Sequence, residues 1–194
     1  MKLVCATHNP GKLREITAVL APMGFTILSA REAGYEGEPE ETGVTFRENA
    51  RIKAAAIMEA TGLPALADDS GLQVDALDGA PGVYSARYGG FDDDSQRNAY
   101  LLRNISHVEP SNRGARFVCS LCCLFPDGRE VTAEGVCEGA LLTEPRGEEG
   151  FGYDPIFYIP SLGRTLAQLT MEEKNRISHR AAALRLLAVK LKEC

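Results

Sequence analysis

Carboxylate side chains stand in two separate segments of the chain, in an arrangement that suits a divalent metal. Asp68 and Asp69 directly follow the short apolar run Leu66-Ala67. Glu40 and Glu41 lie in a loop rich in acidic residues. Carboxylate oxygens are the hard ligands that bind Mg²⁺ beside phosphate groups, so these residues predict a magnesium site. Taken alone, the same residues fit a solvated turn and a plain acidic loop equally well.

A phosphate-binding segment is indicated where the first expected strand, residues 2–7, runs into a helix. Asn9 fits the cap of that helix and Pro10 its first turn. Gly11 lets a ligand approach the backbone, and Lys12 adds a positive charge. Free N–H groups and the helix dipole favour an anion at such a terminus. The P-loop pattern is absent, and an ordinary turn and helix cap remains the favoured interpretation of this segment in isolation.

Two further groups of side chains could contact a nucleotide. Asn49 and Lys53 are four residues apart on an expected helix and therefore share a face, although a solvated helix side is the commoner situation. An aromatic ring such as that of Phe151 can stack on a base, and Asp, His and Arg side chains can hydrogen-bond to the edge of that base. In the absence of other support, Phe151 could equally belong to the core and His179 could be a structural histidine.

The elements that would position these side chains alternate between strands and helices, which predicts an α/β domain. Thr45 and Glu48 form a capping box for a long helix that ends near Gly62. Residues 126–128 are a hairpin signal between two strands, so the sheet is expected to be mixed, with helices packed on it. Strands are also expected at residues 25–28, 66–67, about 115–125 and about 130–139, and an apolar run lies at 156–159. Gly-rich loops are expected at 79–90 and 147–154. Helices are expected from Asn9, at about 95–106 and near the C-terminus, where one side of the helix carries Ile177, Ala181, Leu184, Leu187 and Leu191.

Length, charge and hydropathy restrict the class of protein. A chain of 194 residues suits one domain that spans residues 1–194. The net charge of −6 argues against nucleic acid as a partner but is compatible with a small phosphorylated ligand. No apolar run reaches membrane-spanning length and no signal peptide is recognised, so a cytoplasmic location without a membrane partner is expected. Cys119 and Cys122 have metal-like spacing, but they fall in an expected buried strand and are interpreted as small hydrophobic residues.

Taken in order, these segments resemble the inosine/xanthosine triphosphate pyrophosphatase family, which includes the inosine triphosphatases. Each motif is weak alone, but the ordered set spans nearly the whole chain, and only residues 91–145 carry little of it. His8 departs from the family pattern, because many members have Gly there, and Pro10 is variable. The matching pieces are Thr7-His8-Asn9-Pro10-Gly11-Lys12, Glu41-Thr42-Gly43, Phe46 with Glu48-Asn49-Ala50 and Lys53, Ala67-Asp68-Asp69-Ser70-Gly71-Leu72, residues 79–87, residues 150–157, and Glu173-Lys174 with Ser178-His179-Arg180.

The resemblance implies a mixed α/β fold of two lobes with the active-site cleft between them, usually in a homodimer. It implies that Glu41 and Asp69, together with Asp68, bind Mg²⁺, and that Asp69 is also the base for the attacking water. Whether Glu40 or Glu41 faces the metal stays open. The residues implied to bind the triphosphate are Thr7, His8, Asn9, Pro10, Gly11, Lys12 and Lys53, and Ser70 would also touch the substrate. The residues implied to bind the base are Phe151, which would stack on it, and Gly152, Tyr153, Asp154, Lys174, His179 and Arg180.

The implied activity is Mg²⁺-dependent hydrolysis of non-standard purine nucleoside triphosphates (dITP, ITP and XTP) to a monophosphate and pyrophosphate, which would cleanse the nucleotide pool. Donors on His179 and Arg180 would satisfy the carbonyl at position 6 of the base. An amine at that position would leave these donors unpaired, at a cost of about 1–3 kcal/mol per group. How guanine is rejected does not follow from the residues. The alternatives are a non-catalytic nucleotide-binding module, which would not need paired carboxylates, and a pyrophosphatase for other nucleotides, which would not need the purine-binding residues.

Overall fold

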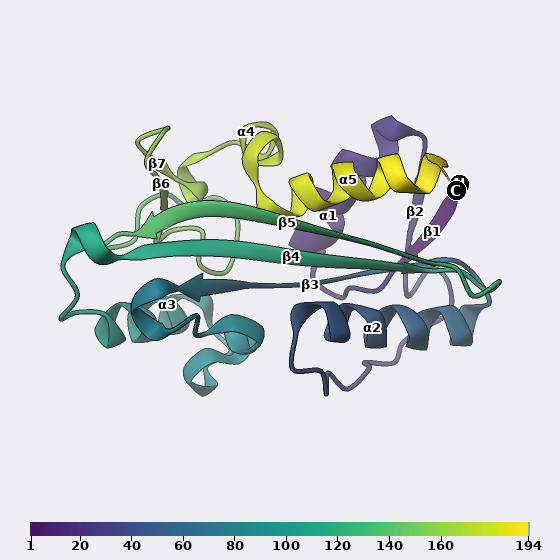
Figure 1. The fold of residues 1–194 in the computed structure, drawn as a ribbon, viewed down its shortest axis with the longest axis horizontal. Helices are drawn as coiled ribbons and strands as arrows, with labels where there is room; N and C mark the ends of the chain where they lie inside the picture. Colours follow the sequence, from purple (N-terminus) through teal and green to yellow (C-terminus); the bar gives the residue numbers. More distant parts are fainter. Residues whose placement is uncertain (194) are drawn as a thin grey trace. The chain divides into compact units, whose positions relative to one another are not determined.

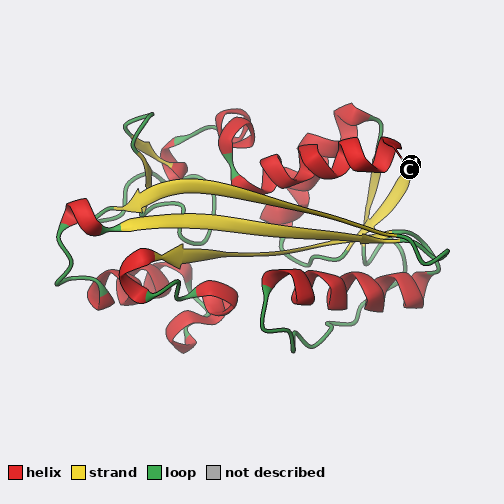
Figure 2. Cartoon of the chain, in the orientation of Figure 1, coloured by secondary structure: helices red, strands yellow, loops and turns green. Residues whose placement is uncertain are grey.

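The computed structural model describes residues 1–193 and contains a seven-stranded sheet of order β2-β1-β3-β4-β5-β6-β7 (Figures 1 and 2). The mixed α/β class predicted from the sequence is therefore confirmed. The strands are β1 (Lys2–Cys5), β2 (Thr26–Ser29), β3 (Ala65–Val74), β4 (Gly114–Leu124), β5 (Glu130–Leu141), β6 (Phe157–Ile159) and β7 (Arg164–Thr165). The α-helices are α1 (Pro10–Leu20), α2 (Phe46–Thr61), α3 (Asp94–Asn104), α4 (Met171–Ile177) and α5 (His179–Glu193).

The chain forms two compact units, and strands β3, β4 and β5 each contribute residues to both. Unit 1 contains Met1–Ser70, Cys119–Gly135 and the segment that begins at His179. Unit 2 contains Gly71–Val118 and Val136–Ser178. The expectation of a single domain over residues 1–194 stays a prediction.

Unit 1 is a parallel sheet region covered by helices on both faces. Strand β1 pairs in parallel with β2 and with β3. Helices α1 and α5 cover one face of these strands and α2 covers the other (Figure 1). The side chains of β1 alternate accordingly, because Leu3 and Cys5 pack with the α1 and α5 residues Ile16 and Leu184, whereas Val4 packs with Ile57 of α2.

The strand order of unit 1 reverses beside β1. The chain passes from β1 through α1 to β2, and then through α2 to β3, which lies on the other side of β1. Open α/β sheets bind ligands at the carboxyl ends of strands where the order reverses in this way. The backbone N–H of Ala6, just after β1, donates to the carbonyl of Leu66 at 2.8 Å. The loop that follows β1 therefore starts alongside β3, two residues before Asp68.

Unit 2 has its own hydrophobic core, which joins parts of the long strands to α3. Leu72 of β3, Leu101 of α3 and Phe117 of β4 are buried in one cluster with Phe157 of β6. The rings of Phe117 and Phe157 are 4.7 Å apart between centroids. Strand β6 pairs antiparallel with both β5 and β7. Residues 126–128 form the turn between β4 and β5, as predicted.

The start of α1 and both ends of α2 are set by the residues that predicted them. The Asn9 side-chain oxygen accepts hydrogen bonds from the backbone N–H groups of Gly11 and Lys12 at the start of α1. Thr45 and Glu48 form both hydrogen bonds of a capping box at the start of α2. Gly62 ends α2 in the left-handed region, with φ of 65°. Both predicted helices are confirmed.

Three expected element boundaries are wrong. Strand β3 does not stop at Asp68 but continues to Val74, because the charged side chains in its middle are paired within the fold and apolar alternation resumes at Leu72. The C-terminal helix is two helices, because Ser178 has extended backbone with ψ of 151°, so Ile177 belongs to α4. The Gly-rich segment at 79–90 includes a 3-10 helix, Gly82–Gly90, that is interrupted by non-helical residues.

The apolar interpretation of the two spaced cysteines is confirmed. Cys119 and Cys122 are both fully buried in β4, and they belong to hydrophobic clusters on opposite faces of that strand. Burial raises the pKa of each thiol to about 12. Within residues 1–193, no helix is both long enough and apolar enough to cross a membrane.

Candidate active site

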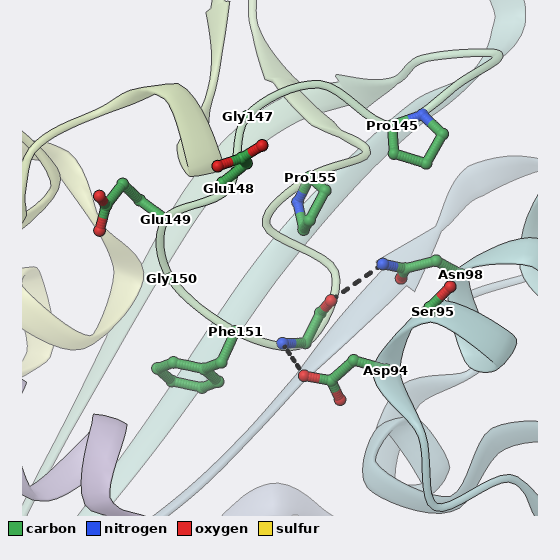
Figure 3. Close-up of a pocket in the computed structure, with 11 residues that line it drawn as sticks. Asp94, Ser95, Asn98, Pro145, Gly147, Glu148, Glu149, Gly150, Phe151 and Pro155 are labelled. Atoms are coloured by element: carbon green, nitrogen blue, oxygen red, sulfur yellow. Dashed lines mark hydrogen bonds between the residues drawn. The ribbon is translucent and has the colours of Figure 1, made fainter.

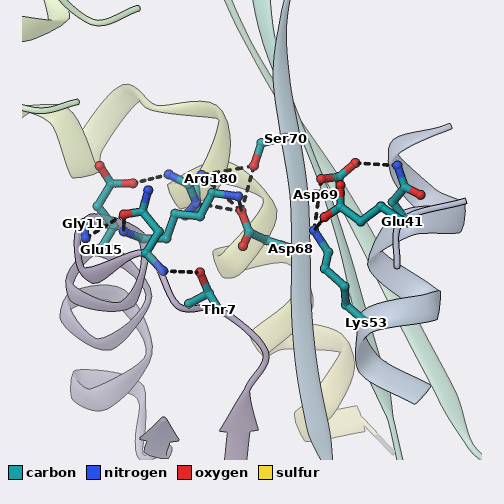
Figure 4. Close-up of polar contacts among 12 residues, drawn as sticks. Thr7, Gly11, Glu15, Glu41, Lys53, Asp68, Asp69, Ser70 and Arg180 are labelled. Atoms are coloured by element: carbon teal, nitrogen blue, oxygen red, sulfur yellow. Dashed lines mark hydrogen bonds and ion pairs between the residues drawn. The ribbon is translucent and has the colours of Figure 1, made fainter. Parts of the chain in front are cut away.

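Two carboxylates from different segments of unit 1 meet at one lysine (Figure 4). The Lys53 ammonium nitrogen lies 2.6 Å from Glu41 Oε1 and 3.0 Å from Asp69 Oδ1. Lys53 comes from α2, Asp69 from β3, and Glu41 from the loop before α2. Glu41 is half-buried, whereas its neighbour Glu40 is exposed. Two hard oxygen ligands predicted from the sequence are therefore close together around one cationic group.

Helix α2 and the preceding loop orient these carboxylates. The Asn49 side-chain nitrogen donates to Asp69 Oδ2 at 3.3 Å, and its oxygen accepts from the Gly43 backbone N–H at 2.8 Å. Asn49 is 1% exposed, so the interpretation of this helix side as solvated is wrong. A Cβ atom at Gly43 would lie 2.7 Å from Asn49 Oδ1 and 2.9 Å from the Asn49 backbone nitrogen. Only glycine allows the loop to approach α2 this closely and so bring Glu41 near Lys53.

The ionisation of this group is set by burial and by its neighbours. Burial raises the pKa of Asp69, the nearby Glu41 raises it further, and Lys53 and Lys12 offset only part of this rise. Burial alone would lower the pKa of Lys53, but the negative charges around it outweigh burial and raise that pKa. Asp69 is consequently a more basic carboxylate than an exposed aspartate, which suits a group that accepts a proton.

Asp68 points to the opposite side of β3 and belongs to a separate ion-pair network (Figure 4). Its Oδ2 atom lies 3.0 Å from the Lys12 ammonium, and it accepts hydrogen bonds from Arg180 Nη2 at 3.1 Å and from Ser70 Oγ at 2.7 Å. Arg180 also pairs with Glu15 of α1 through Nη1 and donates to Ser70 at 3.0 Å. This network connects β3, the start of α1 and the start of α5.

Asp68 is held firmly in its charged form. Burial would raise its pKa, but Lys12, Arg180 and Lys53 outweigh burial, so the pKa of Asp68 lies well below its ordinary value. The two adjacent aspartates are therefore suited to different tasks: Asp69 to accepting a proton and Asp68 to binding cations. The other Asp68 oxygen, Oδ1, is buried and has no hydrogen-bond partner among residues 1–193.

The backbone N–H groups at the start of α1 are not free, although the sequence indicated free donors there. The N–H groups of Gly11 and Lys12 are both bonded to the Asn9 side chain, at 2.8 and 3.1 Å, and Pro10 has no N–H. Thr7 Oγ1 accepts from the Asn9 N–H at 3.1 Å. An anion at this terminus would therefore meet the Lys12 side chain and the helix dipole, and would have to displace Asn9 to reach the first amides. The His8 ring nitrogen Nε2 lies 3.1 Å from the Gly37 carbonyl oxygen, in an exposed position.

Phe151, which is predicted to stack on the base, lies in unit 2 together with Asp154 and Lys174. The Lys174 ammonium nitrogen lies 4.7 Å from the centroid of the Phe151 ring, which is cation–π geometry. The same ammonium donates to Asp154 Oδ2 at 2.6 Å, and that oxygen also accepts from the Phe151 backbone N–H at 3.0 Å. The Tyr153 hydroxyl donates to the Ser85 carbonyl at 2.8 Å. Phe151 is partly exposed, so its interpretation as a core residue is wrong.

The predicted base-contacting residues fall in both units. Phe151, Gly152, Tyr153, Asp154 and Lys174 belong to unit 2. His179 and Arg180 belong to unit 1, where they are 4% and 2% exposed. The Arg180 guanidinium is occupied by Asp68, Glu15 and Ser70, which are contacts that the sequence did not predict. Its role at the base stays a prediction.

The donor set of Glu41 and Asp69 fits Mg²⁺. Within residues 1–193, no three His, Cys, Asp or Glu side chains gather closely enough to bind a metal by themselves. Mg²⁺ commonly takes only one or two protein carboxylates and completes its shell with water and substrate phosphates. Glu41 Oε1 and Asp69 Oδ1 already face one cationic nitrogen, which shows that both oxygens can reach a single positive charge. Asp68 lies on the other side of β3, and its role as a ligand stays a prediction.

Sequence reasoning missed Glu15. This residue is 5% exposed and pairs with Arg180, so it belongs to the buried network around Asp68. A signal was present, because Glu15 is three residues after Lys12 on the same helix and therefore shares its face. A carboxylate on the face that carries the predicted phosphate-binding lysine indicates a polar network there.

Comparison with known proteins addresses the family of this chain. The family model described as Ham1 family matches residues 3–190. The chain is 55% identical over 187 residues to a dITP/XTP pyrophosphatase of Thermus thermophilus, covering 96% of this chain and 90% of that protein. It is 49% identical to the protein of the same name from Bacillus subtilis strain 168, covering 95% and 94%.

Solved structures support the same relationship. The chain is similar to a HAM1 protein from Coxiella burnetii with a TM-score of 0.89 and 43% identity, covering 100% of both chains. It is similar to the Ham1 protein of Staphylococcus aureus with a TM-score of 0.88 and 39% identity, covering 100% and 99%. The resemblance found in the sequence motifs is thereby confirmed. The chain belongs to the Ham1 family.

Proposed function

We propose that this protein hydrolyses non-standard purine nucleoside triphosphates (dITP, ITP and XTP) to the nucleoside monophosphate and pyrophosphate, with Mg²⁺ as cofactor. Relatives that are about half identical over nearly their whole length are named dITP/XTP pyrophosphatases, which supports the substrate class. The observation that carries the proposal is the meeting of Glu41 and Asp69 at Lys53. A non-catalytic nucleotide-binding module would not need a buried carboxylate pair of this kind.

The chain's own residues supply the groups that phosphoryl transfer needs. Glu41 and Asp69 would bind Mg²⁺, which supplies charge stabilisation and lowers the pKa of water. Asp69, with its raised pKa, would accept the proton of the water that attacks the α-phosphorus. Lys12 and Lys53 would bind the triphosphate and stabilise the negative charge on the leaving pyrophosphate. Asp68 and Arg180 would keep Lys12 in place, since Asp68 Oδ2 contacts both.

Base selection would use the aromatic and polar residues that the family resemblance singles out. The Phe151 ring would stack on the purine, and Lys174, which lies over that ring and is paired with Asp154, would fix its position. Donors from His179 and Arg180 would favour a carbonyl over an amine at position 6. Loss of such pairing in a closed site costs about 1–3 kcal/mol per group, which corresponds to about 5- to 150-fold discrimination for each.

The test is a steady-state panel of ITP, dITP, XTP, GTP, ATP and CTP with Mg²⁺, in which products are separated and identified. We expect monophosphate and pyrophosphate from the first three at much higher kcat/KM than from the others. A parallel reaction with EDTA should show no turnover. Nucleotide binding without product formation would favour the non-catalytic alternative, and diphosphate plus orthophosphate as products would exclude attack at the α-phosphorus.

The proposal also covers the oligomeric state and the cellular location of the protein. We propose that the protein is a homodimer, as is usual in the family that its motifs resemble. We also propose that it acts in the cytoplasm, where a free nucleotide pool would be its substrate. Light scattering after size-exclusion chromatography measures the first directly, and a mass of about one chain of 21.0 kDa would contradict it. Fractionation of the source cells tests the second.

A further inference from the structure

Both polar atoms of the Gly152 backbone are bound by one face of α3 in unit 2 (Figure 3). The Gly152 N–H donates to Asp94 Oδ2 at 2.7 Å. The Gly152 carbonyl accepts from the Asn98 side-chain nitrogen at 3.0 Å. Asp94 and Asn98 are four residues apart on α3 and therefore project from the same side of the helix. Gly152 directly follows Phe151, so these two hydrogen bonds act on the residue next to the aromatic ring.

Asp94 is itself anchored. Its other oxygen pairs with Arg97, one helical turn further along α3. Arg97 also donates to the backbone carbonyls of Phe91 and Asp92, at 2.8 and 3.0 Å. Asn98 is 4% exposed and Arg97 is 9% exposed. The side chains that bind Gly152 therefore have restricted positions and form a fixed support.

The loop that carries Phe151 needs such support. Gly150 and Gly152 flank Phe151, and both have positive φ, at 80° and 64°. Glycines at these positions leave the backbone conformationally free in the absence of other contacts. A pocket of about 270 Å³ lies between α3 and this loop and is lined by Asp94, Asn98 and Gly152. On the side of the loop that faces α3, the hydrogen bonds from Asp94 and Asn98, rather than close packing, determine where Gly152 lies.

We propose that Asp94 and Asn98 are positioning residues for the nucleobase. By binding the N–H and C=O of Gly152, they fix the backbone after Phe151 and hence the plane of the ring beside Lys174. This inference rests on the proposed function, because it assumes that Phe151 stacks on a purine. It adds two side chains of α3, outside the family motifs, to the residues that determine base affinity and selectivity.

The first experiment compares Asp94→Ala and Asn98→Ala with wild type. We expect KM for ITP to rise about tenfold in each variant with little change in kcat, within the range that loss of base–aromatic stacking allows. Inorganic tripolyphosphate, which has no base, should inhibit wild type and variants with the same Ki. The matched control is Gln96→Ala, since Gln96 is an exposed residue of the same helix. Asp94→Asn, which keeps an acceptor for the Gly152 N–H, should restore part of the affinity.

A double-mutant cycle distinguishes positioning from a general structural role. If Asp94 acts through the ring, Asp94→Ala should have no further effect on KM in a Phe151→Ala background. A rise in the Ki of tripolyphosphate that matches the rise in KM, or additive losses in the double variant, would overturn the inference. So would unchanged KM in both single variants. If thermal unfolding shows that Asp94→Ala is not folded, the same measurements on the Asn98→Ala variant test the inference.

The failure of this inference is separable from failure of the proposed function. Wild-type protein that releases no pyrophosphate from any purine nucleoside triphosphate would refute the function itself. Normal wild-type turnover combined with unaffected Asp94 and Asn98 variants would refute only the positioning role.

Discussion

Lys53 and Asp69 lie on different elements, α2 and β3, and the ammonium nitrogen of one is 3.0 Å from a carboxylate oxygen of the other. This ion pair, shared with Glu41, raises the pKa of Lys53, while burial raises that of Asp69. The protein thus keeps a cation beside a buried carboxylate whose pKa is raised. Substitutions around this pair are therefore the most direct probes of the proposed chemistry.

Asp69→Asn should lower turnover by several orders of magnitude while nucleotide binding persists. The amide cannot accept a proton, and general-base catalysis commonly contributes about a hundredfold to ten-thousandfold in rate. The amide still fits the space and can still contact Asn49. Pyrophosphate release from ITP measures the rate, and calorimetric titration with ITP measures binding. Near-normal rates in this variant would show that Asp69 is not the base.

Gly43→Ala should raise the Mg²⁺ concentration that gives half-maximal activity. The new Cβ would lie 2.7 Å from Asn49 Oδ1, so the loop would move and carry Glu41 away from Asp69. We expect a shift of about tenfold, the lower end of the roughly 10- to 100-fold loss of metal affinity that follows removal of a group that orients a ligand. Activity titrated against Mg²⁺ measures it. Thr42→Ala, a change at the exposed neighbouring residue, serves as the comparison and should leave the titration unchanged.

Arg180→Ala should destabilise the fold strongly. The guanidinium is 2% exposed and pairs with Asp68 and Glu15, which would remain as buried charges. Removing one partner of a buried ion pair costs about 3–5 kcal/mol. Urea denaturation measures the loss, and Arg176→Ala, at an exposed ion pair, should cost far less. A small effect would mean that Arg180 is not structurally required.

The sequence also predicts that Arg180→Ala weakens discrimination against ATP. The ratio of kcat/KM for ITP to kcat/KM for ATP, measured on the folded fraction of the variant protein, tests this prediction. Arg180→Lys keeps a buried positive charge but loses the planar fork of donors, so it isolates the contribution of geometry. An ITP/ATP ratio equal to that of wild type in both variants would assign Arg180 to the Asp68 network alone.

Glu173→Gln should lower stability in a manner that depends on pH. Hydrogen bonds from Arg164 and from the Thr170 N–H lower the pKa of Glu173 from 4.5 to about 2 in the folded protein. A lowered folded-state pKa stabilises the fold above pH 4.5, and that stabilisation is lost as the pH falls toward 2. The difference in Tm between wild type and Glu173→Gln should therefore be constant near neutral pH and shrink below pH 4.5. Glu172→Gln, at an exposed residue, should show a smaller difference.

Local signals were sufficient for much of the fold. Asn9 specified the start of α1, and Thr45, Glu48 and Gly62 specified the two ends of α2, because capping depends on neighbours within a few residues. The turn at residues 126–128 likewise separated two strands correctly. These elements could be predicted since every contact that defines their ends is encoded in one short segment.

The extent of β3 could not be predicted in the same way. Asp68, Asp69 and Ser70 have the composition of a turn, and they lie inside a strand because Lys12, Lys53 and Arg180 neutralise them. Arg180 is 112 residues away from Asp68 in the chain. The sequence identified these residues as candidates, but it did not show which side chains from other elements Asp68 and Asp69 would pair with.

The hydrogen bonds of Asn9 affect how strongly small anions bind at the start of α1 when no substrate is present. With the amides of Gly11 and Lys12 already satisfied, the start of α1 offers orthophosphate or sulfate only a weak attraction. Under the proposed function, a triphosphate would engage both Lys12 and Lys53 and would therefore bind more tightly than orthophosphate. Cellular orthophosphate, even when abundant, should therefore be a poor inhibitor.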